Sequence, residues 1–529
     1  MLNCTPEEQT VANFSLIRYT IEGQENYSFS ATTLLPELTI HFSAPIDKTT
    51  TANAVNLYGN NTSVPLKYTY KSNDSLLVIS TVSKLSPMVK YDFIVDNQLK
   101  STQGVPLFST LQTSFTTPLD TTDKFPRISD ATLMDLLQRQ TFKYFWDFGH
   151  LVSGLARERN TSGDLVTSGG SGFGVMSIIV GIERGFISRQ QGLERLLTMT
   201  DFLKNKAERH HGVYPHWLHG STGKTIPFST KDDGGDLVET SYLIAGLLCA
   251  SEYFDQTNAN ETLLRKNIKD IWEGVEWNWH TKGNENVLYW HWSSKYNWEM
   301  NLPVRGWNEC LITYVLAAAS PTYPISKDVY EKGWARSGGI KNGKSFYGIT
   351  LPFGPDQGGP LFFSHYSFLG INPSNLKDQY GDYRQQVVNH SKINYAYCVA
   401  NPRKYAGYSK DCWGLTASDS NGGYDAHSPT NDKGVITPTA ALSSMPFTPE
   451  ESMDALRFFY YKLGDRIYKD YGFVDAFNLT NIWFANSFLA IDQGPIIIMT
   501  ENHRSGLIWK LGMKNHHIKG GLDKLGFTY

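Results

Sequence analysis

The hydrophobic pattern of this 529-residue chain changes near residue 120, and the change separates two kinds of structure. Before it, the runs 38–42, 75–80 and 91–95 are rich in β-forming residues and are separated by Asn, Asp, Gly, Pro and Ser. Short strands at this spacing predict an antiparallel β-sandwich. After it lie all 13 tryptophans, and apolar residues recur at helical spacing. We therefore predict a sandwich at 1–120 and a helical domain at 121–529, joined by the polar segment 117–126.

The second domain is predicted to be mainly α-helical. Asp130 should cap a helix that runs through Phe145-Trp146. Further helices are predicted near 172–184, 188–206, 237–254, 261–276, 307–319, 375–398, 450–469 and 495–512. Long loops rich in Gly, Trp and Asp separate them. Many helices with elaborate loops favour an (α/α) toroid over a plain bundle, whose connections are shorter.

Composition excludes several classes of function. The net charge is -3 and no basic cluster indicates nucleic acid or an anionic membrane as a partner. No apolar run reaches the ~18 residues of a membrane span. The His and Cys residues lack zinc-ligand spacing, and the glycine-rich run 169–174 has no P-loop lysine, so neither a metal nor an organic cofactor is expected.

The cysteines and the first residues bear on the compartment. Met1-Leu2-Asn3-Cys4 resembles the end of a bacterial lipoprotein signal, although no apolar stretch precedes it in this sequence. We expect a periplasmic or cell-surface monomer, with Cys4 as a possible lipid anchor; an ordinary disordered terminus is the alternative. Cys398 and Cys412 could form a disulfide in an oxidising compartment, whereas Cys249 and Cys310 should be buried thiols.

The first candidate site is an acidic segment. Asp232, Asp233 and Asp236 precede an apolar helix whose first turn contains Glu239. Such crowding raises carboxyl pKa values, and a carboxyl that stays protonated near neutral pH can act as a general acid. Asp236 and Glu239 also have the spacing of a capping box, so a purely structural role is the alternative.

The second candidate is Glu309, which precedes a predicted helix at 311–319. It follows eight aromatic residues, whose rings could stack on sugar rings, with Arg305 as a partner for hydroxyl groups. Several of these rings should instead be buried in the core. The eight are Trp277, Trp279, Tyr289, Trp290, Trp292, Tyr296, Trp298 and Trp307.

The third candidate is Asp492, with Asp475 nearby in the sequence. Pro495 suits the first turn of a helix, which would place Asp492 at the mouth of that helix, where it could also be a cap. Glu501 and Arg504 are three residues apart on the same helix and should pair.

Five segments resemble the bacterial glucoamylase-like domain family, which includes the β-1,2-glucanases of glycoside hydrolase family 144. The resemblance runs in order over roughly 128–520, and the segments are 233–240, 305–310, 472–478, 492–495 and 501–506. It implies an (α/α)6 toroid and an inverting hydrolase of β-1,2-linked glucan, with Asp236, Glu239 and Glu309 around the cleavage point. Residues 42–47 and 113–117 resemble bacterial immunoglobulin-like modules.

A glycosidase requires one carboxylic acid and one carboxylate. We expect Glu309 to be the general acid, Asp236 or Glu239 to be the base or to position water, and Asp492 to be the alternative base. Asp236 and Glu239 share one helix turn, which is too close for an inverting pair that stands ~6.5–9.5 Å apart. The predicted substrate-binding residues are Trp290, Trp292, Trp307, Arg305, Asp233 and Glu501, and the partner is an oligo- or polysaccharide.

Three alternatives stay open. The chain could cleave another linkage, such as an α-glucan or a β-glucoside. It could be a polysaccharide lyase, although lyases need a Tyr or His base and cation-rich subsites, and acidic residues crowd the predicted site. It could also bind carbohydrate without cleaving it. The predicted sandwich has no tryptophan and no clustered acids, so we expect it to carry no chemistry.

Overall fold

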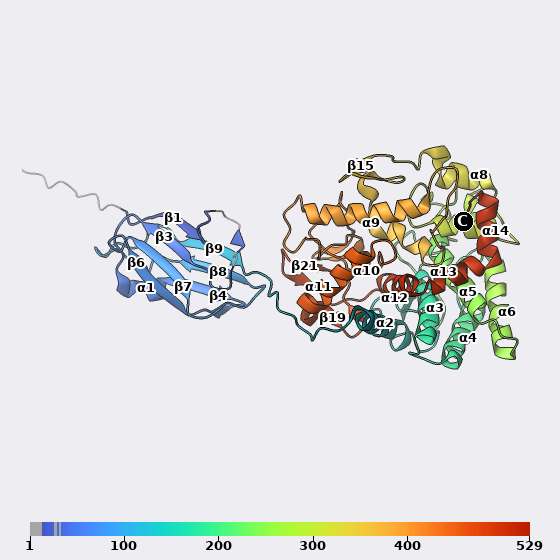
Figure 1. Cartoon of the computed structure of the whole chain (residues 1–529), viewed down its shortest axis with the longest axis horizontal. Helices are drawn as coiled ribbons and strands as arrows, with labels where there is room; N and C mark the ends of the chain where they lie inside the picture. Colours follow the sequence, from blue (N-terminus) through green and yellow to red (C-terminus); the bar gives the residue numbers. More distant parts are fainter. Residues whose placement is uncertain (1–12, 26–28, 31–32) are drawn as a thin grey trace, which may run out of the picture. The chain divides into compact units, whose positions relative to one another are not determined.

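A computed structural model describes residues 13–25, 29–30 and 33–529 of the chain. It divides into a unit that ends at Thr122 and a unit that spans Asp123–Tyr529. The first is built of strands and the second mainly of helices (Figure 1). Cys4 lies outside the described residues.

The first unit is a β-sandwich. Its two sheets have the strand orders β1-β3-β7-β6 and β2-β9-β8-β4-β5 within the described residues. Alternate residues point inward because side chains alternate along a strand, and Leu38, Ile40 and Phe42 are therefore buried in one core with Leu57 and Phe93. The bounds are β1 Leu16–Ile21, β2 Phe29–Ser30, β3 Leu38–Phe42, α1 Lys48–Ala54, β4 Val55–Gly59, β5 Thr62–Ser63, β6 Leu66–Lys71, β7 Leu76–Thr81, β8 Lys90–Val95 and β9 Leu111–Thr116. The three predicted strands are confirmed as β3, β7 and β8.

The helices of the second unit are of two kinds. Some are buried on almost every side, as expected for helices whose residues are apolar all round. These are α3 Ser168–Glu183, α5 Leu237–Tyr253, α7 Leu311–Ala319, α10 Pro438–Leu442 and α12 Ala490–Arg504. Others keep a polar face in solvent, namely α2 Asp130–Trp146, α4 Arg189–Asn205, α6 Ala259–Glu273, α9 Tyr383–Ala400, α11 Pro449–Ile467, α13 Leu507–Lys514 and α14 His516–Leu525. The short helix α8 spans Lys327–Val329.

Short strands tie the loops between these helices together. Each forms a small antiparallel sheet with a neighbour, which gives the long loops defined positions. The sheets are β10 Leu165–Thr167 with β11 Trp217–His219 and β12 Thr225–Ile226, β13 Gly235–Asp236 with β14 His291–Trp292, β15 Ser345–Phe346 with β16 Ile349–Thr350, β17 Ala417–Ser420 with β18 Gly423–Ala426, β19 Tyr468–Lys469 with β20 Gly472–Phe473, and β21 Phe477–Asn478 with β22 Trp483–Phe484.

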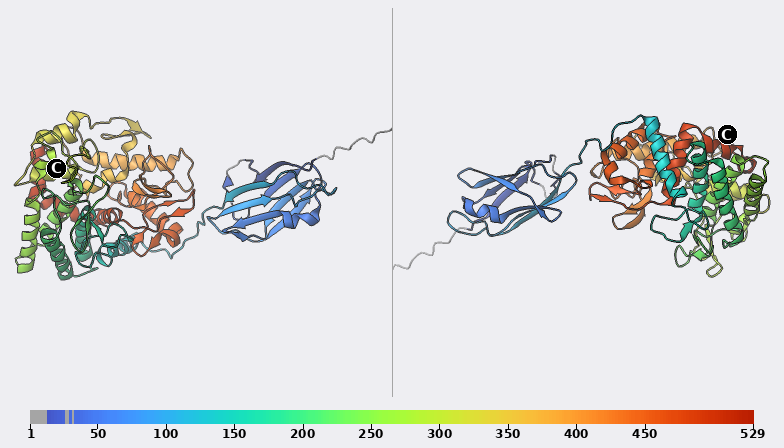
Figure 2. Two further views of the ribbon diagram at one scale, coloured as in Figure 1. Left: turned by 180° about the vertical axis from the view of Figure 1, so that it is seen from behind. Right: turned by 90° about the horizontal axis from the view of Figure 1, so that it is seen from below.

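Helices α3 and α5 pack unusually closely. A Cβ atom at Gly172 would lie 2.2 Å from the carbonyl oxygen of Tyr242, so only glycine permits this approach. The four helices α3 to α6 lie side by side in teal to green in Figures 1 and 2, and α3–α5 and α4–α6 are contacting pairs. The close packing brings the first turns of α3 and α5 together.

Several predicted helix starts are wrong. Helix α3 begins at Ser168 instead of 172, and α7 begins at Leu311 instead of 307. The cap of α2 is Ser129, whose hydroxyl accepts from the backbone N–H of Thr132, and Asp130 is the first helical residue. Helix α9 begins at Tyr383 instead of 375, because Asp382 caps it through the N–H of Gln385. Helix α12 begins at Ala490, so Pro495 lies inside it. A proline this near the start removes one helical hydrogen bond, and the burial of the surrounding apolar residues offsets that loss.

The described cysteines are all buried thiols. Cys249 and Cys310 have the predicted burial, and Cys398 and Cys412 are free in this structure instead of bonded to each other. Among the described residues, every helix is too short or too polar to cross a bilayer.

Because the second unit has its own core, a chain of residues 123–529 should fold alone. Asp123 pairs with Lys462 at 2.6 Å and with Arg127 at 2.7 Å, so its first residues keep their contacts. Scanning calorimetry should show one cooperative transition for this fragment. Its melting temperature should lie within a few degrees of that of one transition of the whole chain. A fragment that aggregates or melts without cooperativity would contradict this prediction.

Candidate active site

The helical unit contains a cavity of about 370 Å³, within the range of roughly 300–1,000 Å³ that small-molecule sites occupy. Its wall combines acidic groups with aromatic rings. The lining residues are Glu158, Arg159, Thr167, His216, Trp217, Phe228, Glu239, Tyr242, Trp290, Glu309, Phe362, Tyr366, Ala417, Tyr424, Leu489 and Ile491. Three of the predicted site residues, Glu239, Glu309 and Trp290, therefore line one cavity.

Asp236 is hydrogen-bonded to residues that line this cavity but does not line it itself. It is fully buried, and its Oδ1 accepts from the backbone N–H of Glu239 at 2.9 Å, so it caps α5 as the structural alternative predicted. Its Oδ2 lies 3.1 Å from His216 Nδ1 and accepts from Trp290 Nε1 at 3.1 Å. Asp236 does not line the cavity; instead it orients two side chains that do.

Glu239 is held at the first turn of α3. Its Oε2 accepts from the backbone N–H of Gly169 at 3.0 Å and from the hydroxyl of Thr167 at 3.4 Å. A Cβ atom at position 169 would lie 2.2 Å from this oxygen, so glycine is required there. Burial raises the pKa of Glu239, while the nearby His216 and the Gly169 N–H favour the carboxylate. The glycine-rich segment thus binds a carboxylate of the chain's own.

His216 provides positive charge at the cavity wall. Burial opposes protonation of its ring, but the carboxylates of Glu239 and Asp236 outweigh burial and raise the pKa of His216 to about 9. The ring stacks on Phe228 with centroids 4.3 Å apart. Burial and then Asp236 raise the pKa of the neighbouring Asp232 to about 7.

Glu309 has the properties of a proton donor. It precedes α7 and is buried, and burial raises the pKa of its carboxyl to about 8, with contributions from the charges of Glu239 and Asp236. It therefore carries a proton at neutral pH. A neutral carboxyl that lines a cavity can donate this proton to a bound molecule.

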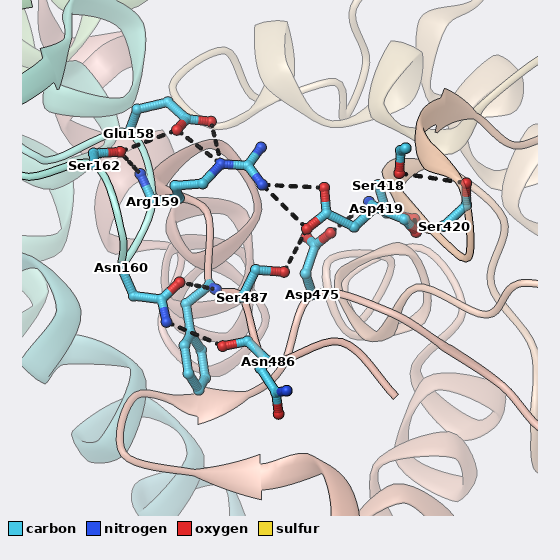
Figure 3. A network of polar contacts seen from close by, with 12 residues as sticks. Glu158, Arg159, Asn160, Ser162, Ser418, Asp419, Ser420, Asp475, Asn486 and Ser487 are labelled. Carbon is cyan, nitrogen blue, oxygen red and sulfur yellow. Dashed lines mark hydrogen bonds and ion pairs between the residues drawn. The ribbon is translucent and has the colours of Figure 1, made fainter. Parts of the chain in front are cut away.

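A second group of charges includes the lining residues Glu158 and Arg159 (Figure 3). Arg159 Nε lies 2.9 Å from Glu158, and its Nη1 lies 3.2 Å from both carboxylate oxygens of Asp419. The backbone N–H of Asp419 donates to Asp475 at 2.6 Å. Burial, and then the charge of Asp475, raises the pKa of Asp492 well above its usual value. Asp492 lies behind the cavity wall, next to the lining residue Ile491.

Two buried donors in the cavity wall lack partners. Tyr242 Oη and Trp217 Nε1 make no hydrogen bond within the part of the chain that the structure describes. An unpaired buried polar group costs about 1–3 kcal/mol, so these two groups lower the stability of the cavity wall.

Five predicted substrate-binding residues lie away from the cavity lining. Trp307 packs between Phe353 and Phe368 in the core, and Arg305 is exposed elsewhere. Trp292 contacts His211 and Trp279, and Asp233 accepts from the hydroxyl of Ser293.

Glu501 is the fifth of these residues. It binds Arg184 at 2.6 Å, while Arg504 pairs with Asp135 at 2.6 Å, so the expected Glu501–Arg504 pair is absent. In each of the five cases packing, and not sequence proximity to the motif, decides where the side chain points.

Several lining residues of the cavity were not predicted from the sequence. Glu158 and Arg159 lie in a loop, and no spacing distinguishes them from surface charges. His216 and Trp217 follow Pro215, and this Pro-His-Trp run was the one local signal available. Tyr242 and Tyr366 read as core aromatic residues, since both lie in apolar segments.

His216, Asp232 and Asp236 also resemble a partial metal site. One ligand atom of each lies within 4.8 Å of the others. His216 Nδ1 already contacts Asp236, and burial keeps Asp232 partly protonated, so the charges within the group account for its geometry without a cation.

The charge of His216 predicts a pH dependence of stability. The folded pKa of about 9 lies above the unfolded value of 6.5, so the charged ring stabilises the fold fully below pH 6.5 and ceases to do so as pH rises through 9. Denaturant unfolding should show that the difference in unfolding free energy between the wild type and His216→Gln decreases as pH rises from 6.5 through 9. An NMR titration in which His216 titrates near 6.5 would contradict the assignment, and His280, with a pKa lowered by burial to about 4, is the internal control.

Comparison with known proteins relates each of the two units to a described family. A family model described as "Putative glucoamylase" matches residues 301–516, and one for a bacterial Ig-like domain matches residues 23–117. An exo β-1,2-glucooligosaccharide sophorohydrolase (non-reducing end) of Parabacteroides distasonis is 44% identical over 421 residues, which are 75% of this chain. The chain covers 58% of the length of that relative.

Two solved structures match the helical unit. A "putative glucoamylase" from Bacteroides uniformis is 56% identical, with a TM-score of 0.75 over 76% of this chain and 99% of its own. An endo-β-1,2-glucanase from Chitinophaga pinensis, in complex with sophorotriose and glucose, is 52% identical, with a TM-score of 0.75 and the same coverage of 76% and 99%. The helical unit of this chain therefore belongs to the glucoamylase-like family, and a bacterial Ig-like domain precedes it.

Proposed function

We propose that this protein hydrolyses β-1,2-linked glucan. The observation that carries the proposal is Glu309, a buried carboxyl whose raised pKa keeps it protonated in the wall of a cavity that Glu239 also lines. Aromatic rings in the same wall suit a sugar. The names of two relatives point to the β-1,2 linkage.

The reaction needs one proton donor and one acceptor. Glu309 gives its proton to the oxygen that leaves as the glycosidic C–O bond breaks. A water molecule attacks the anomeric carbon from the opposite face, and Glu239 takes its proton. We assign Glu239 as the base because it lines the cavity, whereas Asp236 is saturated with hydrogen bonds behind it. Asp492 is the second candidate. Burial raises the pKa of both carboxyls, but only Glu239 lines the cavity, and only Glu239 has His216 nearby to favour its charged form.

We further propose that the helical unit is an (α/α)6 toroid. Buried and half-exposed helices alternate along the chain, from α2, which is half-exposed, and α3, which is buried, to α11 and α12. Between α7 and α10, the buried short 3₁₀ helices at Leu361–Ser364 and Tyr366–Phe368 occupy the position of an inner helix. Such alternation is what six inner and six outer helices require.

The remaining assignments follow from the substrate. A polysaccharide hydrolase with an Ig-like domain suits the periplasm or the cell surface, and we propose that the Ig-like domain is an accessory module without catalytic groups. The proposed enzyme acts as a monomer, without nucleic acid, metal or cofactor.

Linear β-1,2-glucan tests both linkage and stereochemistry. Proton NMR during hydrolysis should show the α-anomer as the first product, because inversion converts a β-linkage into an α-hydroxyl. Linear β-1,3- and β-1,4-glucans and an α-1,4-glucan serve as controls and should not be cleaved at a comparable rate. The β-anomer as first product would refute the inverting mechanism, and cleavage of a control glucan alone would refute the substrate.

Glu309→Gln should lower kcat by ~10² or more while the melting temperature stays within a few degrees, since Gln keeps the shape but has no acidic proton. Wild-type kcat should fall as pH rises through about 8, where Glu309 loses its proton, and the variant should lack this alkaline limb.

Glu501→Gln is a matched control that removes a buried carboxylate outside the cavity. It should lower stability but leave kcat of the folded protein unchanged. A Glu309→Gln variant with more than half of wild-type activity would remove Glu309 from the mechanism.

A further inference from the structure

A second cavity adjoins the one that contains Glu309. Its volume is about 530 Å³, and it shares Arg159 and Tyr424 with the first cavity. Its wall is polar with one large indole ring. The lining residues are Arg159, Asn160, Thr161, Asp419, Ser420, Gly423, Tyr424, Trp483, Ala485, Asn486 and Ser487. Because the two residues belong to both walls, the cavities meet at Arg159 and Tyr424.

Arg159 is held rigidly at this boundary. Its Nε and Nη1 are occupied by Glu158 and Asp419, and Ser487 donates to Asp419 from the far side (Figure 3). Its Nη2 makes no hydrogen bond within the described residues, and in Figure 3 it points away from both carboxylates. Because the guanidinium is already fixed, its Nη2 can donate to a ligand with little further loss of side-chain entropy.

Two aromatic rings line the second cavity together with Arg159. Tyr424, on strand β18 directly after the turn of the β17–β18 hairpin, is 53% exposed although it lines both cavities, so its ring is open to a ligand. Trp483 lies on β22, which is anchored by its pairing with β21 through Asn478. Rings that are partly exposed and fixed by short strands are suited to stacking on the apolar face of a pyranose.

Asparagine side chains shape the rest of the wall. Asn160 uses both ends of its amide, accepting from the N–H of Phe488 at 3.0 Å and donating to the carbonyl of Asn486 at 3.0 Å. It therefore joins the Glu158–Arg159 loop to the segment that follows Trp483. These bonds fix the position of the indole relative to Arg159.

We propose that this second cavity binds glucosyl residues of the same glucan chain that is cleaved beside Glu309, so that the chain passes Arg159 and Tyr424 and continues onto Trp483. This inference rests on the proposed function and names the part of the substrate that occupies the second cavity. The arrangement makes Trp483 a determinant of chain length: it contacts residues that only a longer substrate has.

Two side-chain truncations test the assignment, with kcat/KM measured on linear β-1,2-gluco-oligosaccharides of increasing length and on the polymer. Trp483→Ala should lower kcat/KM on long chains by about 5- to 10-fold, the loss expected for one aromatic stacking contact. On the shortest oligosaccharide that the wild type cleaves, the change should stay below about two-fold. Trp483→Phe keeps an aromatic face and should recover most of the activity on long chains.

Tyr323→Ala is the matched control, because Tyr323 is exposed on the turn after α7 and lines neither cavity. It should leave the dependence on chain length unchanged. Equal losses for Trp483→Ala on all lengths, or no loss on any, would overturn the subsite while leaving the proposed function intact. A wild-type chain that cleaves no β-1,2-glucan of any length would refute the proposed function and, with it, the assignment of this cavity to glucan.

Discussion

The contact between the first turns of α3 and α5 is the constraint on which the cavity depends. Glycine at 169 and 172 lets the two helices approach, and the N–H of Gly169 then reaches the carboxylate of Glu239 at 3.0 Å. Asp236 caps the first turn of α5 and, through its second carboxylate oxygen, orients His216 and Trp290. One backbone approach therefore places a carboxylate, a cation and an indole in one wall.

The distribution of cations decides which carboxyl keeps its proton. The positive charge of His216 lies close to the carboxylates of Asp236 and Glu239, and Arg159 forms ion pairs with Glu158 and Asp419. Glu309 has no such partner within the described residues, so burial and the neighbouring negative charges raise its pKa to about 8. Environments that push carboxyl pKa values apart create separate acid and base roles from similar side chains.

Sequence alone predicted the division of the chain, the order of most helices and the two acidic motifs, because hydrophobic period and helix capping are local properties. Glu239 and Glu309 were predicted because each adjoins a helix start, and both line the cavity. Trp307 and Glu501 do not line it, because burial against Phe353 and pairing with Arg184 depend on segments remote in sequence. Glu158 and Arg159 were missed for the same reason: a loop charge becomes a cavity residue only when Asp419 approaches it.

Two parts of the cavity wall differ in how they are built: one contains Glu239 and Glu309, and the other contains Arg159 and Tyr424. The part with Glu239 and Glu309 includes the ends of buried helices, whose packing leaves little freedom at these two carboxyl groups. The wall with Arg159 and Tyr424 is formed by loops joined through short strands and side-chain hydrogen bonds. Loops tolerate insertions and substitutions that helix cores do not. Relatives that share the buried helices can therefore differ in the length of chain they accept, because changes in this loop wall alter the path beyond Arg159 without moving Glu309.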